Sequence, residues 1–362
     1  MNKIFTSESV NVGHPDKTCD IIADSFLDAA LSHDPNAQMA VECAIKDDLL
    51  MIYGEATTTA KINYEHIARE VLKEIGYTNH FEIIKQISEQ SPEINKAVVA
   101  SELTANDQGT AYGYATNETQ EFMPLPIVLA HKLMQRYQEF RGERAEFLPD
   151  AKSQVSVEYN ANGMPQRIHT VLLSVSHTEK MTREEIEFCM VNFVIDKVLA
   201  EYNDMVVNTK YIINPSGKFT IWGSFSDSGC VGRKIVVDTY GGVGRVGGGC
   251  FSSKNATKVD RSGAYYARYV AKSIVAAKMA DRCEVSVSYA IGVAEPLCVN
   301  IETFGTNNVP EQKIYEFVKK NFDFRPSSII KELGLLKPIY KATACYGHFG
   351  REIFPWEKVK RS

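Results

Sequence analysis

Apolar and polar positions in the first third of the chain alternate first with the period of a strand and then with that of a helix. Residues 39–54 are predicted to form two strands on either side of a polar turn at 46–48, and thus a hairpin. Apolar residues then recur at helical spacing over about 62–75, and a further strand is predicted at 81–87. This region is therefore expected to combine a hairpin, a helix and one more strand.

A second unit of the same kind is predicted in the middle of the chain. Strands expected at 153–159 and 167–175 flank Asn162-Gly163, a dipeptide typical of tight hairpin turns. The next helix is predicted to begin at Thr182, whose spacing from Glu185 fits a capping box.

The last third of the chain repeats the pattern after a strand pair expected around Pro215-Ser216-Gly217. A helix is predicted at about 261–280, strands at 284–291 and 297–304, and another helix near 310–321. Three such units predict an α+β fold of three similar domains, each a mixed sheet with helices packed on one face, related by pseudo-threefold repetition.

The domain boundaries follow from these units. We place an N-terminal domain at residues 1–95, a central domain at 111–219 and a C-terminal domain at 220–362. Residues 96–110 show no clear periodicity and are predicted to form a loop, and loops of this length are often functional.

Charge and cysteine content exclude several classes of protein. The net charge is -5 and the pI is near 6.0, which argues against a general nucleic-acid-binding protein. The first residues lack the apolar core of a signal peptide, and no apolar run approaches the roughly 18 residues of a membrane span. The eight cysteines are scattered without metal-binding spacing, so we expect reduced thiols in a cytoplasmic protein without structural zinc. A large anionic ligand must then be met by local clusters of lysine and arginine.

The most distinctive segment is a glycine-rich run within residues 238–260. Six of the ten residues from Gly241 to Cys250 are glycine, and backbone N–H groups in such a run can surround an anion. Residues 235–237 before the run are expected to form a strand, and a helix predicted just after Asp260 adds positive potential at its N-terminus. Four flanking cations predict a polyphosphate site: Arg233, Lys234, Lys254 and Lys258.

Two familiar phosphate-binding motifs do not fit this run. A Walker A motif needs Gly-Lys followed by Ser or Thr, which the run lacks. Gly242, Gly244 and Gly247 have dinucleotide-binding spacing, but more glycine stands where the helix should begin. A flexible glycine turn with solvated lysines is the plain structural alternative.

A second motif, Gly13-His14-Pro15-Asp16-Lys17, opens a helix predicted to run to about Leu31. Asp16 is either a stabilising first-turn acid or a ligand for Mg2+ carried on a phosphate. His14 is either structural or a hydrogen-bond donor to a leaving oxygen.

Further candidates lie on or beside predicted strands. Lys152 can reach a phosphate and Asp150 a ribose or adenine, unless both are solvated residues at a strand start. Glu42 lies between alanines on its strand face, so its carboxylate is expected to be partly buried and to need a cation. Phe219 can stack on a base, although a hairpin Phe is more often core, and Asp227 lies in a turn where Asp is common.

In order and spacing, these segments resemble the S-adenosylmethionine synthetase family over essentially the whole chain. The resemblance runs from FTSESVNVGHPDK through DQGTAYGYATNET, RKIVVDTYGGVGRVGGGCFSSK and KVDRSGAYYARYVAK to AIGVAEP and YGHFGREIFPWEK. It implies three similar α+β domains, the use of Mg2+ with activation by K+, and homodimers, often paired into tetramers, with active sites at the dimer interface. It also implies that ATP and L-methionine give S-adenosylmethionine and tripolyphosphate, which is then cleaved to pyrophosphate and phosphate.

The resemblance implies a role for each matching residue. Catalysis falls to His14, Lys152, Arg233 and Lys254. ATP binding falls to His14, Asp150, Lys152, Lys218, Phe219, Asp227, Arg233, Lys234, Cys250 and Lys254. Methionine binding falls to Glu55, Lys96, Asp227 and Lys258. Metal binding falls to Asp16 for Mg2+, Glu42 for K+ and Asp260 for a second Mg2+. Loop 96–107 is expected to gate the site.

Several positions depart from the family pattern. Lys96 stands where glutamine is usual, in a loop that is a few residues shorter. Ser253 and Asn255 replace Gly and Asp, Cys250 replaces a small Ala, and Lys218 replaces Arg. These substitutions bear on rate and methionine affinity rather than on the reaction.

Two other functions stay open from the residues alone. A kinase or ATPase that leaves methionine alone would use the glycine-rich run, but the chain lacks a phosphoryl-transfer motif. A nucleotide sensor that has lost catalysis is opposed by the retained His14, Lys152 and Arg233. A methionine thioether has no proton to lose, so a synthetase needs no general base and relies on positioning and on cations around the triphosphate.

Overall fold

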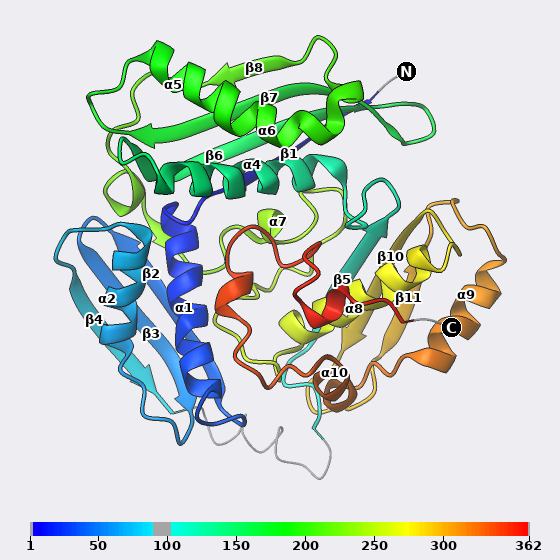
Figure 1. The fold of residues 1–362 in the computed structure, drawn as a ribbon. Coiled ribbons are helices and arrows are strands. Elements are labelled where there is room, and N and C mark those ends of the chain that lie inside the picture. The colour runs from blue at the N-terminus through cyan, green and yellow to red at the C-terminus, as the bar shows by residue number, and fades with distance from the viewer. Residues whose placement is uncertain (1–2, 90–102, 361–362) are drawn as a thin grey trace.

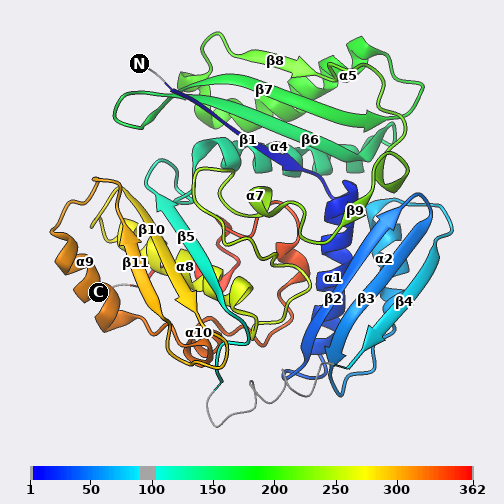
Figure 2. The same ribbon diagram turned by 180° about the vertical axis from the view of Figure 1, so that it is seen from behind.

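The computed structural model describes residues 3–89 and 103–360, which form three sheets with helices packed on one face of each. The helices lie in front of the sheets in Figure 1, and the opposite faces of the sheets are seen from behind in Figure 2. The expected α+β class with three sheet-and-helix domains is confirmed. Among the described residues, no helix combines the length and the apolar character that a membrane crossing requires.

The N-terminal sheet contains the predicted hairpin and one added strand. Its strands in spatial order are β4 (Glu82–Ser88), β3 (Leu49–Thr57), β2 (Gln38–Lys46) and β9 (Gly229–Cys230). The β3–β4 pair is parallel and the other pairs are antiparallel, so the sheet is mixed. Helices α1 (Pro15–Leu31) and α2 (Tyr64–Ile75) cover one face, close to their predicted bounds. Gly229 allows β9 to approach α1, because a Cβ there would lie 2.3 Å from the Pro15 carbonyl.

The central sheet is also mixed. Its strands in spatial order are β1 (Lys3–Val10), β6 (Phe147–Tyr159), β7 (Pro165–His177) and β8 (Lys210–Ile213). Helix α4 (Leu125–Gly142) packs on β1 and β6. The capping box of Thr182 and Glu185 starts a helical segment, as predicted. That segment consists of α5 (Arg183–Cys189), a π-helical turn (Met190–Ile195), α6 (Asp196–Leu199) and a 3-10 turn (Ala200–Met205).

The C-terminal sheet has antiparallel pairs only among its described strands. In spatial order these are β11 (Cys298–Glu302), β10 (Arg282–Tyr289) and β5 (Gly109–Thr116). Its helices are α8 (Val259–Ala276), α9 (Glu311–Asn321) and α10 (Pro326–Leu333). Short 3-10 turns lie at Gly223–Phe225, Lys341–Thr343 and Pro355–Glu357.

Two predicted strands are absent from the described structure. Residues 235–237 belong to a helical turn, α7 (Ile235–Asp238), in which the Asp238 N–H donates to the Lys234 carbonyl at 2.8 Å. No second strand follows the turn at 215–217. Phe219 instead exchanges hydrogen bonds with His177, donating to its Nε2 at 3.2 Å and accepting from its N–H at 2.9 Å.

Each sheet is completed by a strand from a distant part of the chain. β1 joins the central sheet with Lys3 opposite Tyr159, and β5 joins the C-terminal sheet with Thr116 opposite Arg282. β9 reaches back from the C-terminal part to pair with β2. One apolar core is shared by the N-terminal and C-terminal sheets, and a second lies in the central domain.

Candidate active site

The N-terminus of α1 brings together residues from distant segments. His14 caps the helix, and its Nδ1 accepts a hydrogen bond from the Asp16 N–H at 3.2 Å. Asp16 Oδ1 accepts from the Cys230 N–H at 3.0 Å, and its Oδ2 accepts from Lys234 Nζ at 2.6 Å. Arg233 Nε lies 3.5 Å from the same carboxylate. A carboxylate, an imidazole and two cations therefore meet at one helix end.

Burial and charge fix the protonation states of this group. Burial, followed by the charges of Lys234 and Lys152, lowers the pKa of His14 to about 3, so the ring is neutral at physiological pH. Because Nδ1 accepts from a backbone N–H, the ring proton lies on Nε2, which can donate. Burial disfavours the charged form of Asp16, but hydrogen bonds from Lys234 and the Cys230 N–H lower its pKa below the usual value.

A second group lies at the N-terminus of α8. Lys254 Nζ donates to Asp260 Oδ2 at 2.5 Å, and Asp260 stands in the first turn of the helix. Lys258 is the N-cap, and burial lowers its pKa while the charge of Glu55 opposes that shift. Lys254 also forms an isolated antiparallel bridge with Ala40 on β2, the strand that carries Glu42.

Glu42 and Cys250 are both half-buried. The hydroxyl of Tyr53 donates to Glu42 at 3.4 Å. Burial raises the pKa of the Cys250 thiol to about 11, so the thiol stays protonated. Gly232 packs directly against Cys250, because a Cβ on Gly232 would lie 2.2 Å from the Cys250 Cβ. This contact joins the segment of Arg233 to that of Lys254.

The predicted nucleotide residues lie beside the α1 group. Asp150 is buried, and its Oδ2 accepts from the Gly223 N–H at 2.9 Å. Its Oδ1 is buried without a hydrogen-bond partner among the described residues, and burial raises the pKa of this carboxyl to about 6. Lys152, Lys218 and Asp227 are exposed, and Phe219 is half-buried. Lys96 lies outside the described residues.

The glycine-rich run has a packing role that sequence reasoning missed. A Cβ at Gly241 would lie 2.3 Å from Ser7 Oγ on β1, and one at Gly247 would lie 2.3 Å from the Thr110 carbonyl on β5. The run therefore fits closely between strands of two different sheets.

A row of aspartates along α1 was also missed, apart from Asp16. The four residues are spaced four apart, and each accepts at least one main-chain N–H from the C-terminal part of the chain. The pairs are Asp16 with Cys230, Asp20 with Gly232, Asp24 with Ser253, and Asp28 with Tyr340 and Lys341. The sequence did contain a signal for them, the regular spacing of acidic residues on an otherwise apolar helix. Acidic residues on a buried face need buried hydrogen-bond partners.

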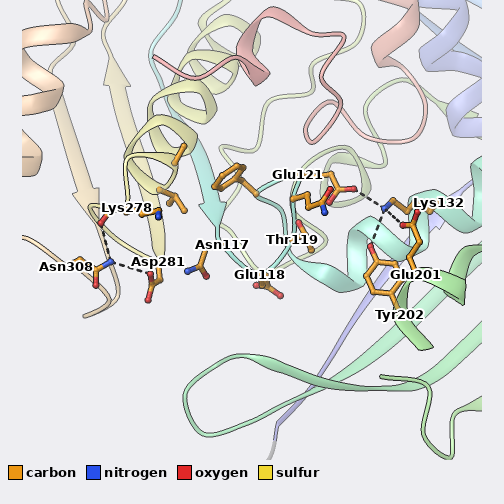
Figure 3. A pocket seen from close by; sticks show the side chains of 14 residues that line it. Asn117, Glu118, Thr119, Glu121, Lys132, Glu201, Tyr202, Lys278, Asp281 and Asn308 are labelled. Atoms are coloured by element: carbon orange, nitrogen blue, oxygen red, sulfur yellow. Dashed lines mark hydrogen bonds and ion pairs between the residues drawn. The ribbon is translucent and has the colours of Figure 1, made fainter. Parts of the chain in front are cut away.

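A separate cavity lies away from the two helix N-termini described above. It has a volume of about 870 Å³ and opens beside β5, α4 and α8 (Figure 3). Lys132 there contacts Glu121 at 3.0 Å and Glu201 at 3.8 Å. None of the predicted site residues that the structure describes lines this cavity, so the chemistry of the side chains, and not cavity size, marks the candidate site.

Comparison with known proteins finds one family over almost the whole chain. Family models for the N-terminal, central and C-terminal domains of S-adenosylmethionine synthetase match residues 2–99, 102–219 and 221–358. The chain is 47% identical to the S-adenosylmethionine synthase of Clostridium tetani (strain Massachusetts / E88), in an alignment that covers 100% of this chain and 98% of that protein. Because the three models span almost all of it, this chain belongs to the S-adenosylmethionine synthetase family.

Proposed function

We infer that this chain makes S-adenosylmethionine from ATP and L-methionine and then cleaves the released tripolyphosphate to pyrophosphate and phosphate. The observation that carries this function is the gathering of cations at two neighbouring helix N-termini. Arg233 and Lys234 lie at α1, and Lys254 lies at α8. Helix N-termini and fixed cations together suit a polyphosphate leaving group. The similarity to a protein named S-adenosylmethionine synthase supports the same reaction.

The transfer step needs no proton acceptor. A lone pair on the methionine sulfur attacks the 5′ carbon of ATP, a sulfur–carbon bond forms, and the bond from that carbon to the triphosphate oxygen breaks. The bonding electrons leave with the triphosphate, where Lys152, Arg233 and Lys254 stabilise the charge. Neutral His14 donates from Nε2 to the leaving oxygen. The same cations then hold tripolyphosphate for hydrolysis.

The carboxylates Asp16 and Asp260 fit Mg2+ that arrives on the triphosphate. Each pairs with a lysine, and the described residues contain no group of three or more acids, histidines or cysteines placed to hold a metal ion. Mg2+ in nucleotide enzymes is typically held by one or two carboxylates plus phosphate oxygens. When bound, it neutralises charge on those oxygens. Glu42, half-buried on β2, is proposed to support K+.

Separate metal roles give separate defects. Asp16→Asn is expected to raise the Mg2+ concentration needed for activity, and Glu42→Gln to blunt activation by K+ with little change in Mg2+ titration. Both are measured by initial rates in metal titrations. Identical metal profiles for the two variants would contradict this division.

The remaining predicted residues are proposed to bind the two substrates. The unpartnered Oδ1 of Asp150 supports a hydrogen bond from a ribose hydroxyl or the adenine amine. The other proposed nucleotide contacts are Lys218, Phe219, Asp227 and Cys250. For methionine we propose Glu55, Asp227, Lys258 and Lys96, with Lys96 beside the substrate carboxylate.

We further propose a homodimer with shared sites, paired into a tetramer, in the cytoplasm. Helices cover one face of each sheet, and the other face exposes large apolar side chains such as Ile4, Met51 and Ile84. All eight cysteines are free, which suits a reducing compartment. Met51→Lys is expected to yield monomers in analytical ultracentrifugation, whereas Ile353→Lys, at an exposed site outside the sheets, serves as the matched control. A dimeric Met51→Lys protein would contradict the sheet-face interface.

One assay separates the proposed function from its two rivals. The protein is incubated with ATP, Mg2+ and K+, with and without methionine. A synthetase forms a sulfonium product and pyrophosphate only with methionine. A kinase or ATPase forms ADP, a nucleotide sensor forms no product, and either outcome would overturn the proposal.

A further inference from the structure

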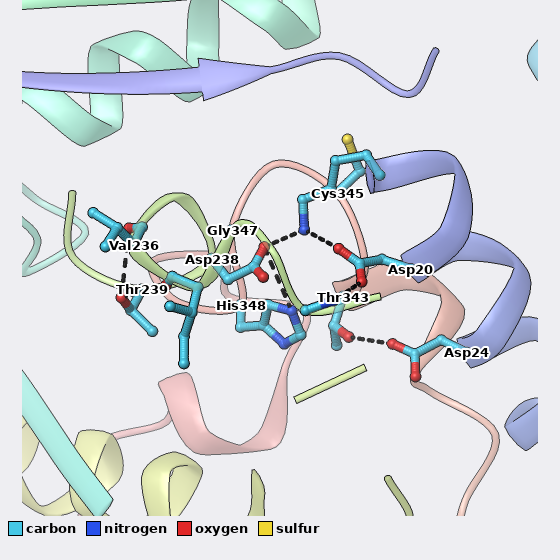
Figure 4. Close-up of polar contacts among 12 residues, drawn as sticks. Asp20, Asp24, Val236, Asp238, Thr239, Thr343, Cys345, Gly347 and His348 are labelled. Atoms are coloured by element: carbon cyan, nitrogen blue, oxygen red, sulfur yellow. Dashed lines mark hydrogen bonds and ion pairs between the residues drawn. The ribbon is translucent and has the colours of Figure 1, made fainter. Parts of the chain in front are cut away.

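The aspartate row on α1 connects the helix to both cation segments of the site. Four-residue spacing places Asp16, Asp20, Asp24 and Asp28 along one side of the helix, about 6 Å apart along its axis. Asp20 and Asp24 point from α1 into a cluster of buried polar groups that includes Asp238 and His348 (Figure 4). Asp20 and Asp24 therefore act where water is excluded and where main-chain contacts are strong.

Asp20 holds the segment that carries Arg233. Its Oδ1 accepts from the Gly232 N–H at 2.8 Å, and Gly232 directly precedes Arg233. Its Oδ2 accepts from Lys17 Nζ at 2.8 Å, and Lys17 also donates to Asp238 at the end of α7. Lys17 and Asp20 are fully buried, so this carboxylate has little freedom to move.

Asp24 holds the segment that carries Lys254. Its Oδ1 accepts from the Ser253 N–H at 3.0 Å, and Ser253 directly precedes Lys254. Arg261 donates to both oxygens of Asp24, at 2.7 and 2.8 Å, which fixes the plane of the carboxylate. Two aspartates about one turn apart on α1 thus hold the main chain immediately before two different site cations.

We propose that Asp20 and Asp24 are positioning residues that place Arg233 and Lys254 for the triphosphate by holding the amides of Gly232 and Ser253. This inference rests on the proposed function for the identity of the anion. A rigid helix sets the distance between the two amides, and the Gly232–Cys250 contact packs the two segments together. The spacing of the cations then exists before the ligand binds, which is the condition for effective charge stabilisation.

Asp28 offers a matched comparison within the same row. It also lies on α1 and accepts two main-chain N–H groups, from Tyr340 and Lys341, both at 2.9 Å. Neither of those residues is among the proposed phosphate cations. A purely structural role for the row would make Asp28 as important for phosphate binding as Asp20.

The test compares Asp20→Asn with Asp28→Asn in the full-length protein. Four quantities are measured: kcat, the methionine KM, the affinity for tripolyphosphate by calorimetry, and amide hydrogen exchange across the chain. For Asp20→Asn we expect faster exchange at residues 230–234, weaker tripolyphosphate binding and a fall in kcat of about 10²-fold, as for a misplacement of about 1 Å. The methionine KM should change little. For Asp28→Asn, faster exchange should appear at 338–343 with unchanged tripolyphosphate affinity.

Each outcome decides the proposal. Equal losses of tripolyphosphate affinity in both variants, or unchanged affinity and kcat in Asp20→Asn, would overturn it. If Asp20→Asn does not fold, Asp20→Glu keeps the charge beside Lys17 and displaces the acceptor by one methylene. It should show the same changes in exchange and tripolyphosphate affinity, and wild-type values would again overturn the proposal. Absence of the sulfonium product from wild-type protein would reject the proposed function, whereas the exchange and tripolyphosphate measurements would still judge the positioning role.

Discussion

The ion pairs at the helix N-termini differ from those of the interior in their access to water. Lys234 and Lys254, which pair with Asp16 and Asp260, are 18% and 19% exposed. The Arg268–Glu357 pair is fully buried, and Lys272 donates to the same glutamate at 2.8 Å. A partly solvated lysine can turn toward a phosphate at modest cost, because the buried Asp16 still has Arg233 and the Cys230 N–H as partners. A buried arginine cannot leave without stranding a charge. We therefore propose that the same residue types serve ligand binding in one region, whereas they serve structure in the other.

The largest expected effect is the loss of unfolding free energy when a buried ion pair of the interior is broken. Arg268→Met removes the hydrogen bonds of Arg268 to Glu357 and to the carbonyls of Tyr114 and Phe122. Loss of one partner from a buried pair typically costs about 3–5 kcal/mol of unfolding free energy. Urea denaturation measures this loss.

The control for that change is Arg69→Met. Arg69 pairs with Glu65 one helical turn away, a kind of pair that contributes only about 0.3–0.5 kcal/mol, and it also donates to the Phe81 carbonyl at 3.2 Å, a hydrogen bond of about 1 kcal/mol. An Arg268→Met protein as stable as the Arg69→Met protein would remove the distinction between the two classes of ion pair.

The next effect is on rate, with little change in stability. Lys254→Met should lower kcat by about 10²–10³-fold, the usual loss when one preorganised donor is removed. Its melting temperature should stay near that of the wild type. Arg136→Met, at a surface pair with Glu139, is the control and should keep the wild-type kcat. If Lys254→Met instead unfolds as readily as Arg268→Met, its ion pair belongs with the structural ones.

Buried histidines from the two regions predict how stability depends on pH. Burial lowers the pKa of both His14 and His131 to about 3. Below about pH 6.5 the unfolded chain binds protons that the folded chain does not, so each histidine lowers stability by about 1.4 kcal/mol per pH unit. Thermal melts of ligand-free protein between pH 7 and pH 5, values chosen to span the ordinary histidine pKa, should show this fall.

Bound tripolyphosphate then distinguishes the contribution of His14 to this pH dependence from that of His131. Tripolyphosphate beside His14 favours its charged form, so bound tripolyphosphate should reduce the slope in wild-type protein. The slope should change less in a His14→Asn variant, which retains the interior contributions of His131 and His348, since burial lowers the pKa of both. A ligand effect of equal size in both proteins would place His14 away from the anion.

The smallest effect concerns a backbone strain beside Lys254. Ser253 has a φ of 79° and a buried hydroxyl without a hydrogen-bond partner in the described part of the chain. Ser253→Gly should raise unfolding free energy by about 1 kcal/mol, because glycine adopts this conformation without a steric penalty. Ser252→Gly is the control, since that hydroxyl is equally unpartnered but the residue is not among those with positive φ. Equal gains in unfolding free energy in both variants would show that the unpartnered hydroxyl, and not the backbone strain, lowers stability.

Local patterns predicted most helices and strands because those patterns reflect burial within one element. The predicted helix after Pro15 ends at Leu31 in the structure, and the Thr182–Glu185 capping box forms. Residues 235–237 were wrongly predicted as a strand because Ile-Val-Val favours strands locally. A short helical turn with a buried C-terminal half formed instead, where Asp238 is held by Lys17 on α1.

The chemistry of the site was easier to predict than its support. Asp16, Lys234 and Arg233 stand in recognisable motifs, and the structure brings them together. The roles of Asp20 and Asp24 depend on which main-chain amides arrive beside α1, and those amides come from more than 200 positions further along the chain. No local pattern contains that information.

Because β1, β5 and β9 each pair with strands from a distant part of the chain, the sheets cannot be completed in the order in which the chain is synthesised. β1 leaves the ribosome long before β6, the strand with which it pairs, because β6 begins only at residue 147. The second edge of β2 likewise stays unpaired until β9, at residues 229–230, has been synthesised. Until then these unpaired edges can pair with other chains, which is a route to aggregation. A gene fragment cut at a domain boundary would leave one sheet lacking an edge strand and another strand without its sheet, so truncation products of this protein should need the missing segment supplied in trans.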